Sequence, residues 1–150
     1  MLYRLKRSIV VALCFGLLCL GALVSPAMAG DSVSCTVYEI EAASAPGKAF
    51  VDPKLKALNK KLSKPVFRAW NRFQPLSIQS VAVKSMHKAK VKLNGGSDFT
   101  LLYRGKMQKE GARDRFLLSL SVDNKSKRVF STKVELDAGD YFLVGNVVPM

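Results

Sequence analysis

The sequence predicts an α+β domain that is mainly an antiparallel β meander of about six strands, with one amphipathic helical segment inserted after the first strand. Most of the chain after Pro75 alternates between apolar and polar residues, which is the period of a half-buried strand. Turns rich in Gly, Asn and Asp separate these runs, whereas leucines at helical spacing occur between residues 55 and 62. A small β-sandwich with a helical insertion is the close alternative.

The first 29 residues are expected to be a secretory signal peptide. They begin with three basic residues and no acid, continue with an almost wholly apolar stretch at residues 9–24, and end in Ala-Met-Ala. Cleavage after Ala29 would leave residues 30–150 as a single α+β domain in a secreted or periplasmic protein. An uncleaved membrane anchor is the alternative, but the apolar stretch is shorter than the ~20 residues that span a bilayer.

Residues 33–40 are predicted as the first strand of this domain. Its apolar residues begin on the face of Val33 and end on the face of Ile40, because Glu39 interrupts the first face. The buried face of the strand is therefore expected to change near Glu39.

A helix is predicted to begin at Asp52-Pro53, because Asp caps free backbone N–H groups and Pro suits the first helical position. Three apolar residues at spacings of three and four form one stripe, which consists of Leu55, Leu58 and Leu62. Lysines surround the other sides of this helix. Pro65 interrupts it, and a second short helical turn is expected before Pro75, with Trp70 in the core.

The rest of the chain is predicted to be β structure. Residues 81–93 alternate throughout and are predicted as one long strand, straight or bent in its middle. Asn94-Gly95 is predicted as a hairpin turn, because both residues tolerate positive φ. Hairpins are also expected around Gly111, at residues 123–126 and at residues 137–140. The strands that they join are predicted at residues 99–106, 116–122, 130–136 and 141–148.

The composition is that of a globular chain with a large excess of positive charge. Apolar residues make up 49% of the chain, which excludes general disorder. Three of the 24 basic residues and none of the 11 acidic residues lie in the predicted leader, so residues 30–150 carry 21 basic and 11 acidic residues and a net charge of +10. Cleavage would also remove Cys14 and Cys19 and leave Cys35.

The sequence offers little for an active site, and the chain is expected not to be an enzyme. His87 is expected to pack against the edge of the core, and Cys35 is expected to be a small buried hydrophobic residue. Glu39 and Glu41 share a strand face at ~7 Å and are expected to lie at a solvated strand edge. No cofactor or metal is expected, because typical zinc or calcium ligand spacings do not occur. The least favoured hypothesis is a small hydrolase that uses Cys35 or the two glutamates.

The basic residues are the one positive signal for function. Lysines project from one face of the predicted long strand and from the back of the predicted helix, and together they could form one cationic surface. The predicted anion-binding residues are Lys84, Lys88, Lys90, Lys92, Lys56, Lys60, Lys61, Lys64, Arg68 and Arg72. The alternative is that these lysines only keep a strand edge unpaired and a secreted protein soluble.

This surface predicts a binding protein that interacts with anionic cell-envelope components, either lipid or polymer. Nucleic acid is a less favoured partner, because the aromatics beside the basic residues are expected in the core instead of on a stacking surface. The second hypothesis is a protein–protein interaction subunit of an envelope assembly, which adds its last strand to the sheet of a partner.

Overall fold

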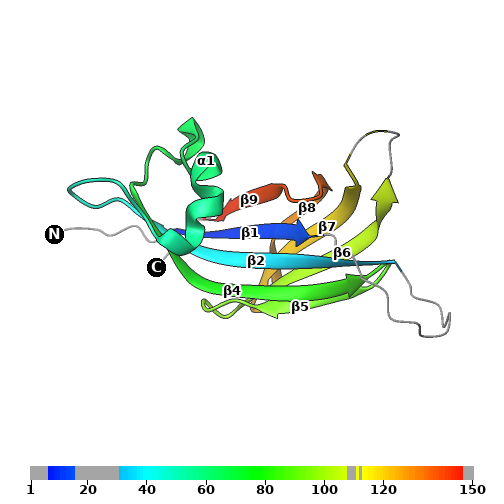
Figure 1. Ribbon diagram of the computed structural model, residues 1–150. Coiled ribbons are helices and arrows are strands. Elements are labelled where there is room, and N and C mark those ends of the chain that lie inside the picture. The colour runs from blue at the N-terminus through cyan, green and yellow to red at the C-terminus, as the bar shows by residue number, and fades with distance from the viewer. Residues whose placement is uncertain (1–6, 16–30, 108–110, 112, 147–150) are drawn as a thin grey trace.

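The computed structural model describes residues 7–15, 31–107, 111 and 113–146, and Figure 1 shows that they form two stacked β-sheets with a helical segment at one end. Eight strands have five residues or more, and a ninth, β3, has two. The predicted antiparallel β structure with one short helical segment is confirmed, and of the two predicted architectures it is the sandwich that forms. The predicted number of about six strands was too low.

The five-stranded sheet contains the first strand of the chain in its interior. Its strands, in spatial order, are β3 (Phe50–Val51), β4 (Arg72–Lys84), β2 (Ser32–Ala43), β1 (Arg7–Phe15) and β9 (Tyr141–Asn146). Neighbouring strands run antiparallel, except for the short parallel pair of β3 and β4. The residues of β1 overlap the apolar stretch that the sequence assigns to the leader.

The four-stranded sheet is an antiparallel meander. Its strands are β5 (Lys88–Lys92), β6 (Ser97–Met107), β7 (Arg115–Asn124) and β8 (Lys127–Asp137). The predicted hairpin turn at Asn94-Gly95 is confirmed, since the backbone N–H of Leu93 donates to the carbonyl oxygen of Ser97 at 2.8 Å. The predicted hairpin between β7 and β8 is also confirmed, and two successive residues with positive φ, Lys125 and Ser126, make its turn.

The larger hydrophobic core lies between the two sheets. Side chains alternate along a strand, so every second residue of β7 reaches this core, as its sequence pattern predicts. The buried residues of β7 on this face are Phe116, Leu118, Leu120 and Val122. Leu136 of β8 is also buried, and its predicted inward neighbours Phe130, Thr132 and Val134 are half-buried. Cys35 is part of this core and is buried, as predicted.

The helical segment packs on the opposite face of the five-stranded sheet (Figure 1). It consists of the 3-10 turn η1 (Pro53–Leu58), the helix α1 (Asn59–Leu62) and the 3-10 turn η2 (Pro65–Phe67). The carboxylate of Asp52 accepts a hydrogen bond from the backbone N–H of Lys54 at 2.8 Å, which is the predicted cap. A second core forms here from Leu55, Leu58, Leu62, Ile40, Ala42 and Phe73, with Trp70 half-buried against it.

The predicted change of buried face in β2 is confirmed. Val33, Cys35 and Val37 contribute to the core between the sheets, whereas Ile40 and Ala42 lie under the helical segment. One strand therefore serves both cores, each on its own face. The two halves of the domain are joined through the five-stranded sheet.

The prediction of one long strand over residues 81–93 was wrong. A turn at residues 85–87 separates β4 from β5, and the two strands belong to different sheets. Met86 turns the chain with a φ of 63°, and its backbone N–H donates to the carbonyl oxygen of Tyr103 at 2.7 Å. The alternating pattern continues across the turn because β4 and β5 face the same core from opposite sides.

Two other boundaries differ from the prediction. Pro75 lies inside β4, which begins at Arg72, so it does not follow a helical section. It stands opposite Ile40 beside a bulge, where the regular ladder is interrupted and a residue without a backbone N–H is tolerated. Residues 137–140 also do not form a hairpin, because β8 and β9 belong to different sheets and the chain crosses between the sheets there.

Candidate anion-binding face

The outer face of the four-stranded sheet carries a row of lysines on its edge strand β5. Ala89 and Val91 turn toward the core, so the alternate residues Lys88, Lys90 and Lys92 are exposed on the other side. Successive members of this row are ~7 Å apart along the strand. The structure therefore agrees with a row of exposed cations for these three lysines.

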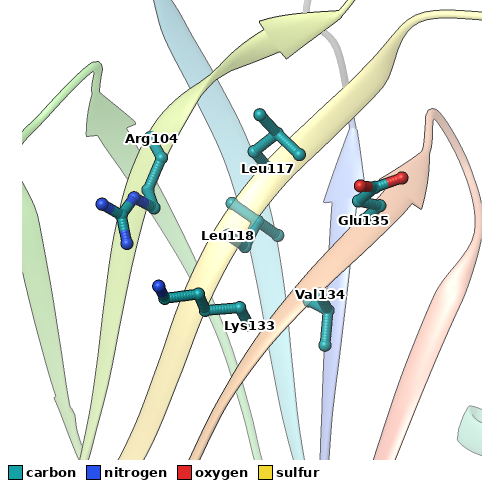
Figure 2. A pocket seen from close by; sticks show the side chains of 6 residues that line it. All are labelled: Arg104, Leu117, Leu118, Lys133, Val134 and Glu135. Atoms are coloured by element: carbon teal, nitrogen blue, oxygen red, sulfur yellow. The ribbon is translucent and has the colours of Figure 1, made fainter.

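Two further cations, Arg104 of β6 and Lys133 of β8, lie on the same face and were not predicted. Ser119 of β7 stands between them, since it is directly opposite Leu102 on β6 and Lys133 on β8. Figure 2 shows the Lys133 side chain extending across β7 toward that of Arg104. We call Lys88, Lys90, Lys92, Arg104 and Lys133 together the basic face.

A partly open hollow lies within the basic face. It has a volume of ≈ 260 Å³ and is lined by Arg104, Leu117, Leu118, Lys133, Val134 and Glu135. Figure 2 shows Glu135 on the far side of Leu117, away from the two cations. The hollow therefore offers two converging cations beside an apolar floor.

Most cations of the basic face have no acidic partner among the described residues. Lys90 lies 3.3 Å from the carboxylate of Asp98. Lys88, Lys92, Arg104 and Lys133 have no carboxylate within 4.0 Å in the part of the chain that the structure describes. Arg104 donates a long hydrogen bond of 3.5 Å to the hydroxyl of Ser119. These side chains therefore keep their charge available to a ligand.

The nearby acid Glu135 is engaged by a neighbouring arginine. Its carboxylate lies 3.6 Å from the guanidinium of Arg115, which also binds Asp137 at 2.8 Å. The hydrogen bond and the charge of Asp137 raise the pKa of Arg115 above its usual value, and Glu135 adds to this effect. The negative charge of Glu135 is thus partly neutralised beside the hollow.

The predicted cations of the helical segment do not join the basic face. They lie on the opposite side of the molecule, because the helical segment covers the face of the five-stranded sheet that turns away from the four-stranded sheet. The exposed members of this group are Lys56, Lys60, Lys64 and Arg68. Arg72 is also exposed, but it belongs to β4 and precedes Phe73, whose side chain packs under the helical segment. Lys84, at the end of β4, is also separated from the β5 lysines by the turn at residues 85–87.

Two further predicted cations, Lys61 and Arg72, have partners within the chain. Lys61 is half-buried, lies 3.0 Å from Asp140 and donates to the carbonyl oxygen of Tyr141 at 3.2 Å. Arg72 lies over the ring of Phe50, with 5.9 Å between the guanidinium carbon and the ring centre. Of the ten predicted cations, only Lys88, Lys90 and Lys92 therefore lie on the basic face.

The residues considered for catalysis differ in their exposure to solvent. His87 is exposed in the β4–β5 turn, where its Nδ1 lies 2.9 Å from the carbonyl oxygen of Ser85, so its predicted place at the core edge was wrong. Cys35 is wholly buried between the sheets. A disulfide from Cys35 to another chain would require this core to open.

Glu39 does not lie at a solvated strand edge, and that prediction was wrong. It is only 2% exposed, and its carboxylate accepts hydrogen bonds from the hydroxyl of Ser77 and the backbone N–H of Asn94. The β5–β6 turn closes over Glu39, which a pattern local to β2 does not reveal. Glu41, two residues further on, is half-buried.

The described residues contain no group of three or more His, Cys, Asp or Glu side chains that could hold a metal ion. Among the helices that the structure describes, none has the length and the apolar composition needed to cross a membrane.

Comparison with known proteins identifies no relative of this chain. No protein-family model, no curated protein and no solved structure matches this chain.

Proposed function

We propose that the protein is a secreted or periplasmic, non-enzymatic binding protein that attaches to anionic components of the cell envelope through its basic face. The observation that carries this proposal is the set of four cations, Lys88, Lys92, Arg104 and Lys133, without a carboxylate partner in the described residues. They stand on one face of a rigid sheet. Such cations attract phosphate and carboxylate groups, and Arg binds them with a planar fork.

The shape of the basic face favours an extended ligand over a small one. Lys88 and Lys133 stand three strands apart in one register row, which corresponds to ~14 Å, and Lys88 and Lys92 are separated by ~13 Å along β5. The hollow between Arg104 and Lys133 is partly open. A polymer chain or a membrane surface presents many anionic groups over such an area.

The buried positions of the other reactive residues also support a binding role. A hydrolase would depend on Cys35 or on Glu39, and both are enclosed by the packed sheets. The basic face, by contrast, is exposed over its whole width.

The test compares two matched variants of the exported protein. One replaces Lys88, Lys92, Arg104 and Lys133 with Gln. The control replaces Lys56, Lys60, Lys64 and Arg68 with Gln, so that both variants lose four positive charges from exposed positions. Binding is measured to vesicles with phosphatidylglycerol, to phosphatidylcholine vesicles and to inorganic polyphosphate, at low and high salt.

The basic-face variant should bind the anionic probes at least about 100-fold more weakly, because each cation near an anionic surface contributes about 1 kcal/mol. The control variant should keep most of its affinity, and salt should weaken binding of the unchanged protein. Preference for vesicles or for polyphosphate identifies the source of the anionic groups. Equal losses in both variants, or equal binding to neutral vesicles, would contradict the proposal.

A second candidate function is strand addition to a partner. In the described part of the chain, β9 is an edge strand of the five-stranded sheet, and its only sheet neighbour is β1. Edge strands offer unpaired backbone groups to another chain.

A further inference from the structure

The position of β1 is unusual for a segment that is expected to be removed. β1 lies inside the five-stranded sheet, between β2 and β9. It pairs with β2 along nine residues, from Arg7 opposite Ala42 to Phe15 opposite Ser34. It also pairs with β9 along six residues, from Ser8 opposite Asn146 to Leu13 opposite Tyr141. Cleavage after Ala29 would therefore remove an interior strand of the sheet.

Removal of β1 would open two facing rows of backbone hydrogen-bonding groups. One row lies on β2 over residues 34–42, and the other lies on β9. Buried backbone groups without partners are costly, so these rows require a new partner. β2 and β9 are both antiparallel to β1, and they are thus parallel to each other and two strand spacings apart, ~9.6 Å.

Contacts at the start of β9 oppose its collapse onto β2. Lys61 of the helical segment donates to the carbonyl oxygen of Tyr141, and the backbone N–H of Ala138 donates to the carbonyl oxygen of Asp114 at 2.9 Å. Phe142 and Val144 of β9 pack toward the core between the sheets. A shift of β9 by one strand spacing would break these contacts.

The surroundings of this position define what could fill it. On one face of the sheet the neighbouring residues of β2 are Cys35 and Val37, which belong to the core between the sheets. On the other face they are Tyr38 and Ile40, which belong to the core under the helical segment, whereas Ser34 and Thr36 lie on this face outside that core. The part of the position beside Tyr38 and Ile40 is therefore covered on both faces, and a strand there needs a continuous apolar run instead of an alternating one. The sequence of residues 9–15, Ile-Val-Val-Ala-Leu-Cys-Phe, is such a run.

We propose that the mature chain carries a strand-acceptor slot between β2 and β9 that binds one extended, apolar segment of a partner protein, antiparallel to both strands. This inference rests on the proposed cleavage after Ala29 and gives the second candidate function a defined site. The bound segment has about nine residues, the length of the β1–β2 ladder. Its backbone supplies the hydrogen bonds, and its side chains complete both cores.

The test uses the protein exported from the full-length precursor. Mass spectrometry of the purified protein establishes whether it begins at Gly30. The probe is a synthetic peptide of residues 4–16, whose three basic residues keep it soluble, and the control is the same peptide with Val11→Pro. Proline removes a backbone N–H from the centre of the ladder and is excluded from interior strands.

The unchanged peptide should raise the Tm of the mature chain by about 8 °C at a peptide concentration of about 100 times its Kd. It should also slow amide hydrogen exchange over residues 34–42 and in β9, and not in β5. The proline peptide should do neither. If the mature chain alone is only partly folded, the unchanged peptide should restore a single cooperative unfolding transition, and the proline peptide should not.

Three results would contradict the proposed strand-acceptor slot. The first is an unchanged Tm with the peptide, and the second is protection of residues 34–42 without it, which would mean that β9 has closed onto β2. The third is an exported protein that retains residues 7–15, which would also refute the proposed cleavage. Anion binding by the basic face is measured with separate variants, so failure of the slot alone leaves salt-dependent vesicle or polyphosphate binding intact.

Discussion

The carboxylate of Glu39 on β2 accepts a hydrogen bond from the backbone N–H of Asn94 in the β5–β6 turn, with 2.8 Å between Oε2 and N. The same oxygen accepts a hydrogen bond of 3.1 Å from the hydroxyl of Ser77 on β4. Asn94 returns a second contact to the five-stranded sheet, since its side-chain amide donates to the carbonyl oxygen of Leu76 at 2.8 Å. One buried acid thus fixes where the two sheets meet.

Replacement of this acid should destabilise the domain. We expect Glu39→Ala to lower the free energy of unfolding by about 2 kcal/mol, because two donors lose their acceptor and a buried space opens. Ser77→Ala removes only one donor and should cost about 1 kcal/mol. Urea unfolding of the two variants and the double variant measures the coupling. A smaller loss for Glu39→Ala than for Ser77→Ala would contradict this role.

The helical segment should depend on its leucine stripe. Leu58, the last residue of η1, is wholly buried. Leu58→Ala should lower the free energy of unfolding by about 3 kcal/mol, because it leaves a cavity in the core. The matched control is Val66→Ala in η2, where the valine is 71% exposed and the change should stay within about 0.5 kcal/mol. Thermal and urea unfolding measure both. Similar losses in the two variants would show that the segment is not held by this core.

The elements that could be predicted from the sequence are those with a strong local pattern. The leucine stripe with its Asp52 cap predicts the helical segment, and the alternation in β7 predicts a strand with every second residue buried. The break between β4 and β5 could not be predicted in this way. Both strands face the same core, so the period of two passes through Met86 without interruption, and Met86 is not a typical turn residue.

The basic face could be predicted only in part for a similar reason. Three lysines at alternate positions of one strand form a local pattern, so the row of Lys88, Lys90 and Lys92 could be predicted. Arg104 and Lys133 lie on different strands, and only the register of β6, β7 and β8 brings them together. The prediction that the lysines of the helical segment share one surface with those of β5 was wrong for the same reason. A local sequence pattern does not show which side of a sheet a helix covers.

A single substitution in the turn between β7 and β8 should stabilise the domain. Lys125 and Ser126 have φ values of 46° and 66°, as a type I′ turn requires, although glycine is favoured at the second position. We expect Ser126→Gly to raise the free energy of unfolding by about 0.5–1 kcal/mol. The control Ser131→Gly, at an exposed position inside β8, should lower it by a similar amount. Urea unfolding checks both signs, and a loss for Ser126→Gly would exclude this turn type.

The stability of the domain should depend on pH through Asp140, at the start of β9. The backbone N–H of Tyr141 donates to the Asp140 carboxylate at 2.8 Å, and Lys61 lies 3.0 Å away. The first contact, followed by the second, lowers the pKa of Asp140 below its usual value of 3.8. A lowered pKa favours the charged form in the folded state. The resulting stabilisation is therefore present above pH 3.8 and is lost as the pH falls through the lower pKa of the folded protein.

Asp140→Asn should remove this contribution, so the variant should be less stable than the unchanged protein at neutral pH and should lose less stability on acidification. Lys61→Met should give an intermediate slope, because the backbone hydrogen bond from Tyr141 remains. Urea unfolding at about pH 6 and about pH 2.5 measures the slopes. If Asp140→Asn loses as much stability on acidification as the unchanged protein, the acid sensitivity lies in other carboxylates, and the Lys61 contact does not hold β9 through charge.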